Sequence, residues 1–226
     1  MYLNASEVAA ACGMNKFKSP MDIVRKYRDR EKEKDLQDVV AEVLHPEELL
    51  QQMQVPRDPT ITAREQLQQA VQARRSSAVA IRNPRISLPG PLARPFEETV
   101  RKDQGTFREA EDVHTLQADL GQPIHRPDRM RYRSFDHIPL KLGGKVDGMI
   151  GEDVVLEMKH RRYRLLGVRI YEKVQCHVYM WILGIRAAVL VETFEDVQKK
   201  HNIPFDDRFW EDVKIGLQKY VDLFTC

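Results

Sequence analysis

Apolar residues recur every three or four positions in several parts of the chain, and this spacing predicts helices. Ser6 fits the N-cap of a short first helix that Gly13 ends, and Pro20 suits the first position of a second helix. The same spacing predicts further helices at residues 36–53, 63–75, 96–120, 171–183 and 208–224. Helices therefore precede and follow the segments with a strand pattern.

Those segments are apolar or alternating runs at residues 140–150, 154–159 and 185–193, which predict three β-strands. Gly151-Glu152-Asp153 has the composition of a short hairpin loop, so it should join the first two strands. The segment before them, residues 121–133, is rich in proline and arginine and is predicted to be a turn region. The pattern as a whole indicates an α/β protein.

The composition changes between residues 28 and 95. A charge-dense run is followed there by a glutamine-rich stretch and then by prolines at 84, 89, 91 and 95. We interpret residues 28–95 as a charged, partly helical insertion whose end, 83–95, is a proline-rich linker. A chain of 226 residues with 42% apolar residues can otherwise form a single domain, residues 1–226, around one core.

Candidate chemistry is concentrated in the predicted hairpin. Alternation along residues 154–159 places Glu157 and Lys159 on one face of the strand. A three-residue loop would pair Ile150 with Val154 and would place Asp147 opposite Glu157, with the Cβ atoms roughly 5 Å apart. Two carboxylates at that distance repel each other unless a cation lies between them.

Oxygen ligands of this kind suit Mg²⁺, with Mn²⁺ as a substitute. Asp147, Glu157 and the backbone carbonyl of Met158 could hold the metal, which would polarise a phosphate and activate a bound water. Lys159 could orient that water or help to deprotonate it. The alternative is an amphipathic hairpin whose charged residues form an ordinary surface salt bridge, and a Glu-x-Lys tripeptide by itself does not exclude it.

The acid and the Glu-x-Lys resemble the core motif of the PD-(D/E)XK nuclease superfamily, and more narrowly its lambda exonuclease and YqaJ-type branch, which includes viral alkaline exonucleases. Four segments carry the resemblance, in this order: residues 5–20, Gly105 to Glu109, Asp147 with Glu157 and Lys159, and Gln175 to Tyr179. The resemblance covers about residues 1–27 and 96–195, roughly half of the chain, and residues 28–95 have no counterpart. The resemblance implies a restriction-endonuclease-like core, a central mixed β-sheet flanked by helices.

The resemblance also implies further site residues. Glu109 would add an acidic group to the metal site, with Glu111 as the alternative in another helix register. Gln175 and Tyr179, one helical turn apart, would both lie at the edge of the active site. The partners implied are DNA, a single-strand annealing protein and further copies of the chain. Further copies are implied because lambda-type enzymes form a ring of three subunits.

Basic residues beside the motifs are candidate DNA contacts, although a net charge of +2 does not by itself indicate a nucleic-acid partner. A solvated surface would explain the same residues. With Ser6, the candidates are Lys16, Lys18, His160, Arg161, Arg162 and Arg164. The three cysteines lack framework spacing, and the sequence shows neither a signal-peptide pattern nor a membrane-span pattern. We therefore expect a soluble, intracellular protein of the cytoplasm or nucleus.

These observations favour a Mg²⁺-dependent DNase that degrades duplex DNA from its ends in recombination, repair or viral genome processing. An endonuclease with the same core, in which the insertion recognises DNA, is the alternative among enzymes. A non-catalytic DNA-binding module with a nuclease fold is the alternative from another class.

Overall fold

The computed structural model describes residues 1–28, 35–81 and 86–225, apart from the side chains at 108–112, 114, 119 and 120. The chain forms two compact units. Unit 1 contains residues 1–28 and 112–226, and unit 2 contains residues 29–111. Residues 29–34 and 82–85 of the predicted insertion lie outside the described residues.

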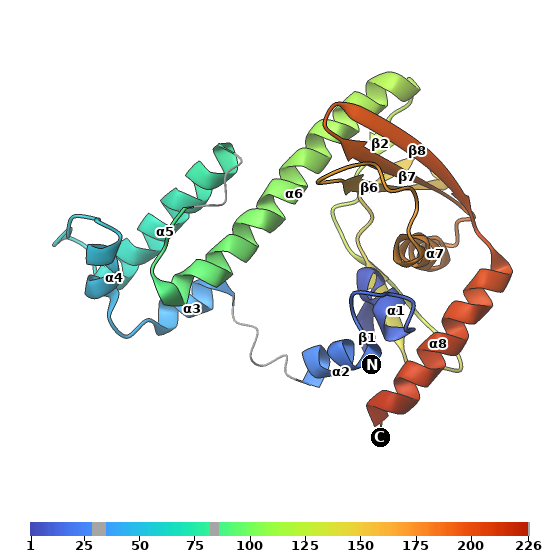
Figure 1. The fold of residues 1–226 in the computed structure, drawn as a ribbon, viewed down its shortest axis with the longest axis horizontal. Helices are drawn as coiled ribbons and strands as arrows, with labels where there is room; N and C mark the ends of the chain where they lie inside the picture. Colours follow the sequence, from blue (N-terminus) through green and yellow to red (C-terminus); the bar gives the residue numbers. More distant parts are fainter. Residues whose placement is uncertain (29–34, 82–85, 226) are drawn as a thin grey trace. The chain divides into compact units, whose positions relative to one another are not determined.

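Unit 1 has two β-sheets (Figure 1). In the larger one the order is β2-β5-β6-β7-β8, with β6 and β7 parallel and the other pairs antiparallel. Its strands are β2 (Ile124–His125), β5 (Gly148–Ile150), β6 (Val154–His160), β7 (Ala187–Phe194) and β8 (Val197–Pro204). The smaller sheet has the order β1-β4-β3, formed by Tyr2–Asn4, Lys141–Gly144 and Arg131–Ser134. A mixed sheet with helices around it confirms the predicted fold class.

Helices cover both faces of the five-stranded sheet. On one face Val155 of β6 and Leu190 of β7 belong to the same core as Val174 and Val178 of α7 (Ile170–Leu183). On the other face the side chains of β6 and β7 pack against the end of α6 (Gly90–Leu120), in a cluster of Val113, Leu116, Ile124, Leu156, Met158 and Val191. Strand β6 therefore sends its apolar side chains to two cores.

The remaining helices of unit 1 close the first of these cores. They are α1 (Ala5–Ala11), α2 (Pro20–Arg28) and α8 (Asp207–Thr225). The N-cap of α1 is Asn4, whose backbone amide donates to the Glu7 carboxylate at 3.1 Å. Ser6 was predicted to cap this helix, but it lies inside the first turn because the chain is already helical at Ala5.

Several predicted elements are corrected by the structure. The single strand predicted at 140–150 is two strands, since the chain leaves one sheet after Gly144 and enters the other at Gly148. The predicted turn region at 121–133 contains β2 and the start of β3. Strand β8 was not predicted at all.

Unit 2 is helical and has its own core. Its helices are α3 (Leu36–Glu42), α4 (Pro46–Gln52), α5 (Ala63–Ala80) and the first part of α6. The expected linker at 83–95 is wrong from residue 90 onward, because α6 begins at Gly90. Pro91 lies in the first turn, where a backbone N–H is not needed. Pro95 costs one helical hydrogen bond, which the complete burial of Leu92 and Phe96 offsets.

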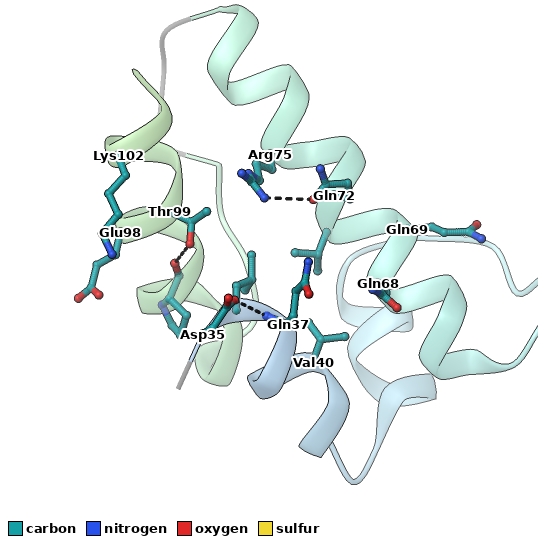
Figure 2. A pocket seen from close by; sticks show the side chains of 13 residues that line it. Asp35, Gln37, Val40, Gln68, Gln69, Gln72, Arg75, Glu98, Thr99 and Lys102 are labelled. Atoms are coloured by element: carbon teal, nitrogen blue, oxygen red, sulfur yellow. Dashed lines mark hydrogen bonds between the residues drawn. The ribbon is translucent and has the colours of Figure 1, made fainter. Parts of the chain in front are cut away.

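A cavity of about 720 Å³ lies between α3, α5 and α6 in unit 2 (Figure 2). Figure 2 shows glutamine side chains of α5 around it, together with Arg75, which donates to Gln72 Oε1 at 3.4 Å. None of the predicted catalytic residues lines this cavity. No helix in the described part of the chain is both long and apolar enough to span a bilayer.

Candidate active site

The hairpin formed by β5 and β6 has the predicted register. Gly148 pairs with Leu156, Met149 with Val155 and Ile150 with Val154. Asp147 directly precedes β5, and its Oδ2 accepts a hydrogen bond of 2.7 Å from the backbone amide of Met158. The Asp147 carboxyl therefore lies across the hairpin beside Glu157, as the sequence predicts.

Burial shapes the chemistry of this acid pair. The side chain of Glu157 is 2% exposed. Desolvation raises the pKa of Asp147, although the Met158 amide and the charge of Lys159 oppose the shift. Two acids held close together in a buried place favour a counter-cation between or beside them.

Lys159 supplies a positive charge to this centre. Its Nζ donates to Glu157 Oε1 and, at 3.4 Å, to Oε1 of Gln175. Burial by itself would lower the pKa of Lys159, but the charges of Glu157 and Asp147 outweigh it and raise the pKa. Lys159 is thus held as a cation on the same face of β6 as Glu157.

Helix α7 brings Gln175 and Tyr179 to this centre. Nε2 of Gln175 donates to the Tyr179 hydroxyl at 2.9 Å, while its Oε1 accepts from Lys159. Loss of solvation raises the pKa of the Tyr179 hydroxyl. The nearby carboxylates of Glu157 and Asp147 raise it further. A continuous hydrogen-bonded chain therefore runs from Glu157 through Lys159 and Gln175 to Tyr179.

The donor set of the hairpin fits a hard divalent cation. Two carboxylates are close together, and within a strand the N–H and C=O of one residue point to the same edge. Because the Met158 amide reaches Asp147, the Met158 carbonyl points to the same edge as that carboxylate. The described residues contain no group of three or more His, Cys, Asp or Glu that could hold a metal. Glu109 lies on α6, with its side chain outside the described residues.

A second cavity, of about 320 Å³, lies beside Tyr179 and Gly144. Three basic residues line its wall, namely His125, Arg129 and Arg131. The sequence showed a basic cluster in this region but gave no reason to associate it with the catalytic residues. Two arginines and Glu152 therefore share this cavity with Tyr179.

The predicted DNA contacts divide into two kinds. Most are exposed at the surface of unit 1, as a contact to DNA would require: Ser6, Lys16, Lys18, His160, Arg162 and Arg164. Arg161 differs from them and is a correction. Its side chain is 7% exposed, and its guanidinium donates to the carboxylates of Glu172 and Glu192 at 2.6 and 2.9 Å. This guanidinium is buried and paired with two carboxylates, so it does not face a bound DNA.

The network around Arg161 was missed by sequence reasoning. Glu192 accepts from the backbone amides of Leu166 and Gly167, at 2.8 and 3.0 Å, and lies 2.9 Å from His201 Nε2. Desolvation, the largest single effect, raises the pKa of Glu192. The hydrogen bonds together outweigh it and lower the pKa to about 2. In the sequence, this network was indicated only by Glu192, a charged residue within an otherwise mostly apolar strand. The network fixes the loop between β6 and α7.

Comparisons with solved structures give likenesses at low identity. The chain is similar to an alkaline exonuclease, LHK-Exo from Laribacter hongkongensis, at 11% identity and a TM-score of 0.49, covering 99% of this chain and 88% of that one. A phage-related exonuclease from Haemophilus somnus has 13% identity, a TM-score of 0.43 and coverages of 55% and 71%. For SSO0001 the identity is 20%, the TM-score 0.40 and the coverages 53% and 63%, so the chain spans less than two thirds of that protein. No protein-family model and no curated protein matches the chain.

Proposed function

We propose that the chain is a Mg²⁺-dependent deoxyribonuclease that acts as an exonuclease on duplex DNA ends, in recombination, repair or viral genome processing. The observation that supports this most is the joined set of Asp147, Glu157 and Lys159 on the β5–β6 hairpin. Two acids and a lysine within hydrogen-bonding reach are what phosphodiester hydrolysis with a metal requires. The motif resemblance points to the same chemistry.

In this proposal Asp147, Glu157 and the Met158 carbonyl would hold Mg²⁺ or Mn²⁺. The bound cation would supply charge to the scissile phosphate and a water of lowered pKa. Lys159 orients the water and the phosphate by its positive charge. Gln175 fixes the ammonium group of Lys159 through its carbonyl oxygen, and Tyr179 fixes Gln175 in turn.

The basic wall beside Tyr179 supports an anionic substrate. Arg129 and Arg131 line one cavity together with Tyr179, and positive charge there attracts the DNA backbone. The exposed residues Arg162 and Arg164 follow the catalytic strand and would add to the same field.

The test is digestion of end-labelled linear and covalently closed circular duplex DNA, with Mg²⁺, Mn²⁺ or EDTA present. We expect metal-dependent loss of linear DNA only. Glu157→Gln and Lys159→Ala should each lower the rate at least a hundredfold, because each removes a group at the reacting centre. Glu211→Gln and Lys219→Ala, both at exposed positions of α8, are matched controls and should keep the wild-type rate.

Other outcomes would change the assignment. Cutting of closed circles would make the protein an endonuclease. Inactivity of the wild type on every substrate, with DNA binding retained, would make it a non-catalytic binding module. Equal loss in Glu157→Gln and Glu211→Gln would contradict the residue assignment.

A further inference from the structure

The loop between α1 and α2 exposes an aromatic ring. The side chain of Phe17 is 71% exposed, and the lysines on either side of it, Lys16 and Lys18, are exposed as well. Single apolar side chains are common on protein surfaces, so exposure by itself indicates nothing. The contacts of this ring distinguish it.

The structure holds Phe17 in a defined place. Its backbone amide donates to Asn15 Oδ1 at 2.9 Å, and the amide of Lys18 donates to Asn15 O at 3.3 Å, so the loop is a hydrogen-bonded turn. Its ring meets Tyr171 edge to face, with centroids 6.2 Å apart and planes at 72°. Lys16 Nζ lies 5.0 Å from the ring centroid. Turn and ring contacts together fix the orientation of Phe17.

Tyr171 connects this ring to the catalytic centre. Tyr171, Gln175 and Tyr179 are spaced four residues apart on α7, so they share one face of the helix. Gln175 contacts Lys159 at 3.4 Å. The Phe17–Tyr171 pair thus begins one helical turn, about 6 Å, from the residue that fixes the catalytic lysine.

We propose that Phe17 is a stacking platform for an unpaired base of the DNA strand, next to the phosphate at the catalytic centre, with Lys16 and Lys18 binding the neighbouring phosphates. Aromatic rings between basic side chains bind single-stranded nucleic acid in this way, because every base has a face that can stack. The inference rests on the proposed nuclease function, since it takes the scissile phosphate to lie at Lys159. Beyond that function, the inference requires the DNA strand to be unpaired where it leaves the catalytic centre.

Tyr163 is the natural comparison. It is 76% exposed, in the loop after β6, and Arg162 Cζ lies 5.2 Å from its ring centroid. Its position between Arg162 and Arg164 gives it the same surroundings of charge. Within the described residues, however, it has no ring contact with α7, so the geometry selects Phe17.

The test measures binding in EDTA, where a metal-dependent nuclease does not cut. The probes are fluorescent DNA hairpins with a short single-stranded tail at the 5′ or the 3′ end, in which one tail nucleotide at a time is abasic. The full chain is compared with Phe17→Ala, Phe17→Trp and Tyr163→Ala, and circular dichroism checks that each variant is folded.

We expect wild type to bind about five- to a hundredfold more weakly when one particular tail nucleotide is abasic. Phe17→Ala should bind the intact tail more weakly by a similar factor and should no longer distinguish that position. Phe17→Trp should restore the distinction, and Tyr163→Ala should keep it. A structural role of Phe17 would lower binding at every position equally.

Three results would overturn the platform. In the first, Phe17→Ala keeps the position dependence. In the second, Tyr163→Ala removes it. In the third, binding by wild type does not depend on the position of the abasic nucleotide. DNA hydrolysis with Mg²⁺ is measured separately on the same variants, so an inactive wild type with intact stacking would reject the nuclease and leave the platform.

Discussion

Gly144 shows how a single residue position shapes the site. A Cβ built on this glycine would overlap Cε1 of Tyr179 and would lie 3.0 Å from the Cβ of Ala5. The Tyr179 side chain is 6% exposed, and its hydroxyl is bonded to Gln175. The ring therefore has little room to move without breaking the link that leads to Lys159. Glycine is required here by the close approach of the tyrosine ring.

We predict that Gly144→Ala lowers the free energy of unfolding by about 1–3 kcal/mol through overpacking, and lowers the nuclease rate because Tyr179 is displaced. Urea denaturation and digestion of linear DNA measure the two effects. Gly105→Ala is the control, since an added Cβ meets nothing within 4 Å there, and in a helix it should stabilise by about 0.5–1 kcal/mol. Equal stability of Gly144→Ala and wild type would contradict the steric argument.

At the scale of elements, local pairing could be predicted from the sequence and distant pairing could not. The β5–β6 register follows from one short loop, and Gln175 with Tyr179 from one helical turn, so both were predictable. Strand β1 pairs with β4, far along the chain. Strand β8 is a sheet edge with a mostly polar sequence, which looks like a loop until β7 is placed beside it.

Arg161 illustrates the same limit for a side chain. In the sequence it is one of several basic residues in a row, with nothing to separate it from Arg162. Its partners, Glu172 and Glu192, come from α7 and β7, and only the folded sheet brings them together. Charge alone therefore predicted a DNA contact where the structure has an internal ion pair.

We predict that Arg161→Met lowers the free energy of unfolding by about 3–5 kcal/mol, because it leaves two buried carboxylates without their cation. Arg162→Met, the adjacent and exposed position, should change it by no more than about 0.5 kcal/mol. Urea denaturation of the two variants gives the comparison. If both variants unfold at the same urea concentration, the Arg161 network does not contribute to stability.

At the scale of the whole molecule, the sequence indicated the insertion but not its extent. The change of composition pointed to residues 28–95, whereas the compact unit reaches Glu111, inside α6. Prolines marked the end of the insertion in the sequence, yet Pro91 and Pro95 lie near the start of a helix that tolerates them. A helix that passes from one unit to the next gives no signal in composition.

Among the described residues, the core of unit 2 is made of side chains from that unit. Its buried side chains come from between Leu36 and Val100, and Leu67 and Leu92 are fully buried among them. A separate core of this kind is what allows a segment to fold without the rest of the chain. The candidate site residues Asp147, Glu157 and Lys159 all lie in unit 1.

We therefore predict that a fragment of residues 29–111 folds by itself, with a helical circular dichroism spectrum and a cooperative thermal transition. Leu67→Ala should lower the free energy of unfolding of the fragment by about 2–5 kcal/mol, because it opens a cavity in the only core that unit 2 has among its described residues. Leu44→Ala, at a side chain 85% exposed, should leave it within about 0.5 kcal/mol of the unmodified fragment. A fragment without a cooperative transition, or equal effects of the two substitutions, would mean that the core of unit 2 depends on unit 1 for its stability.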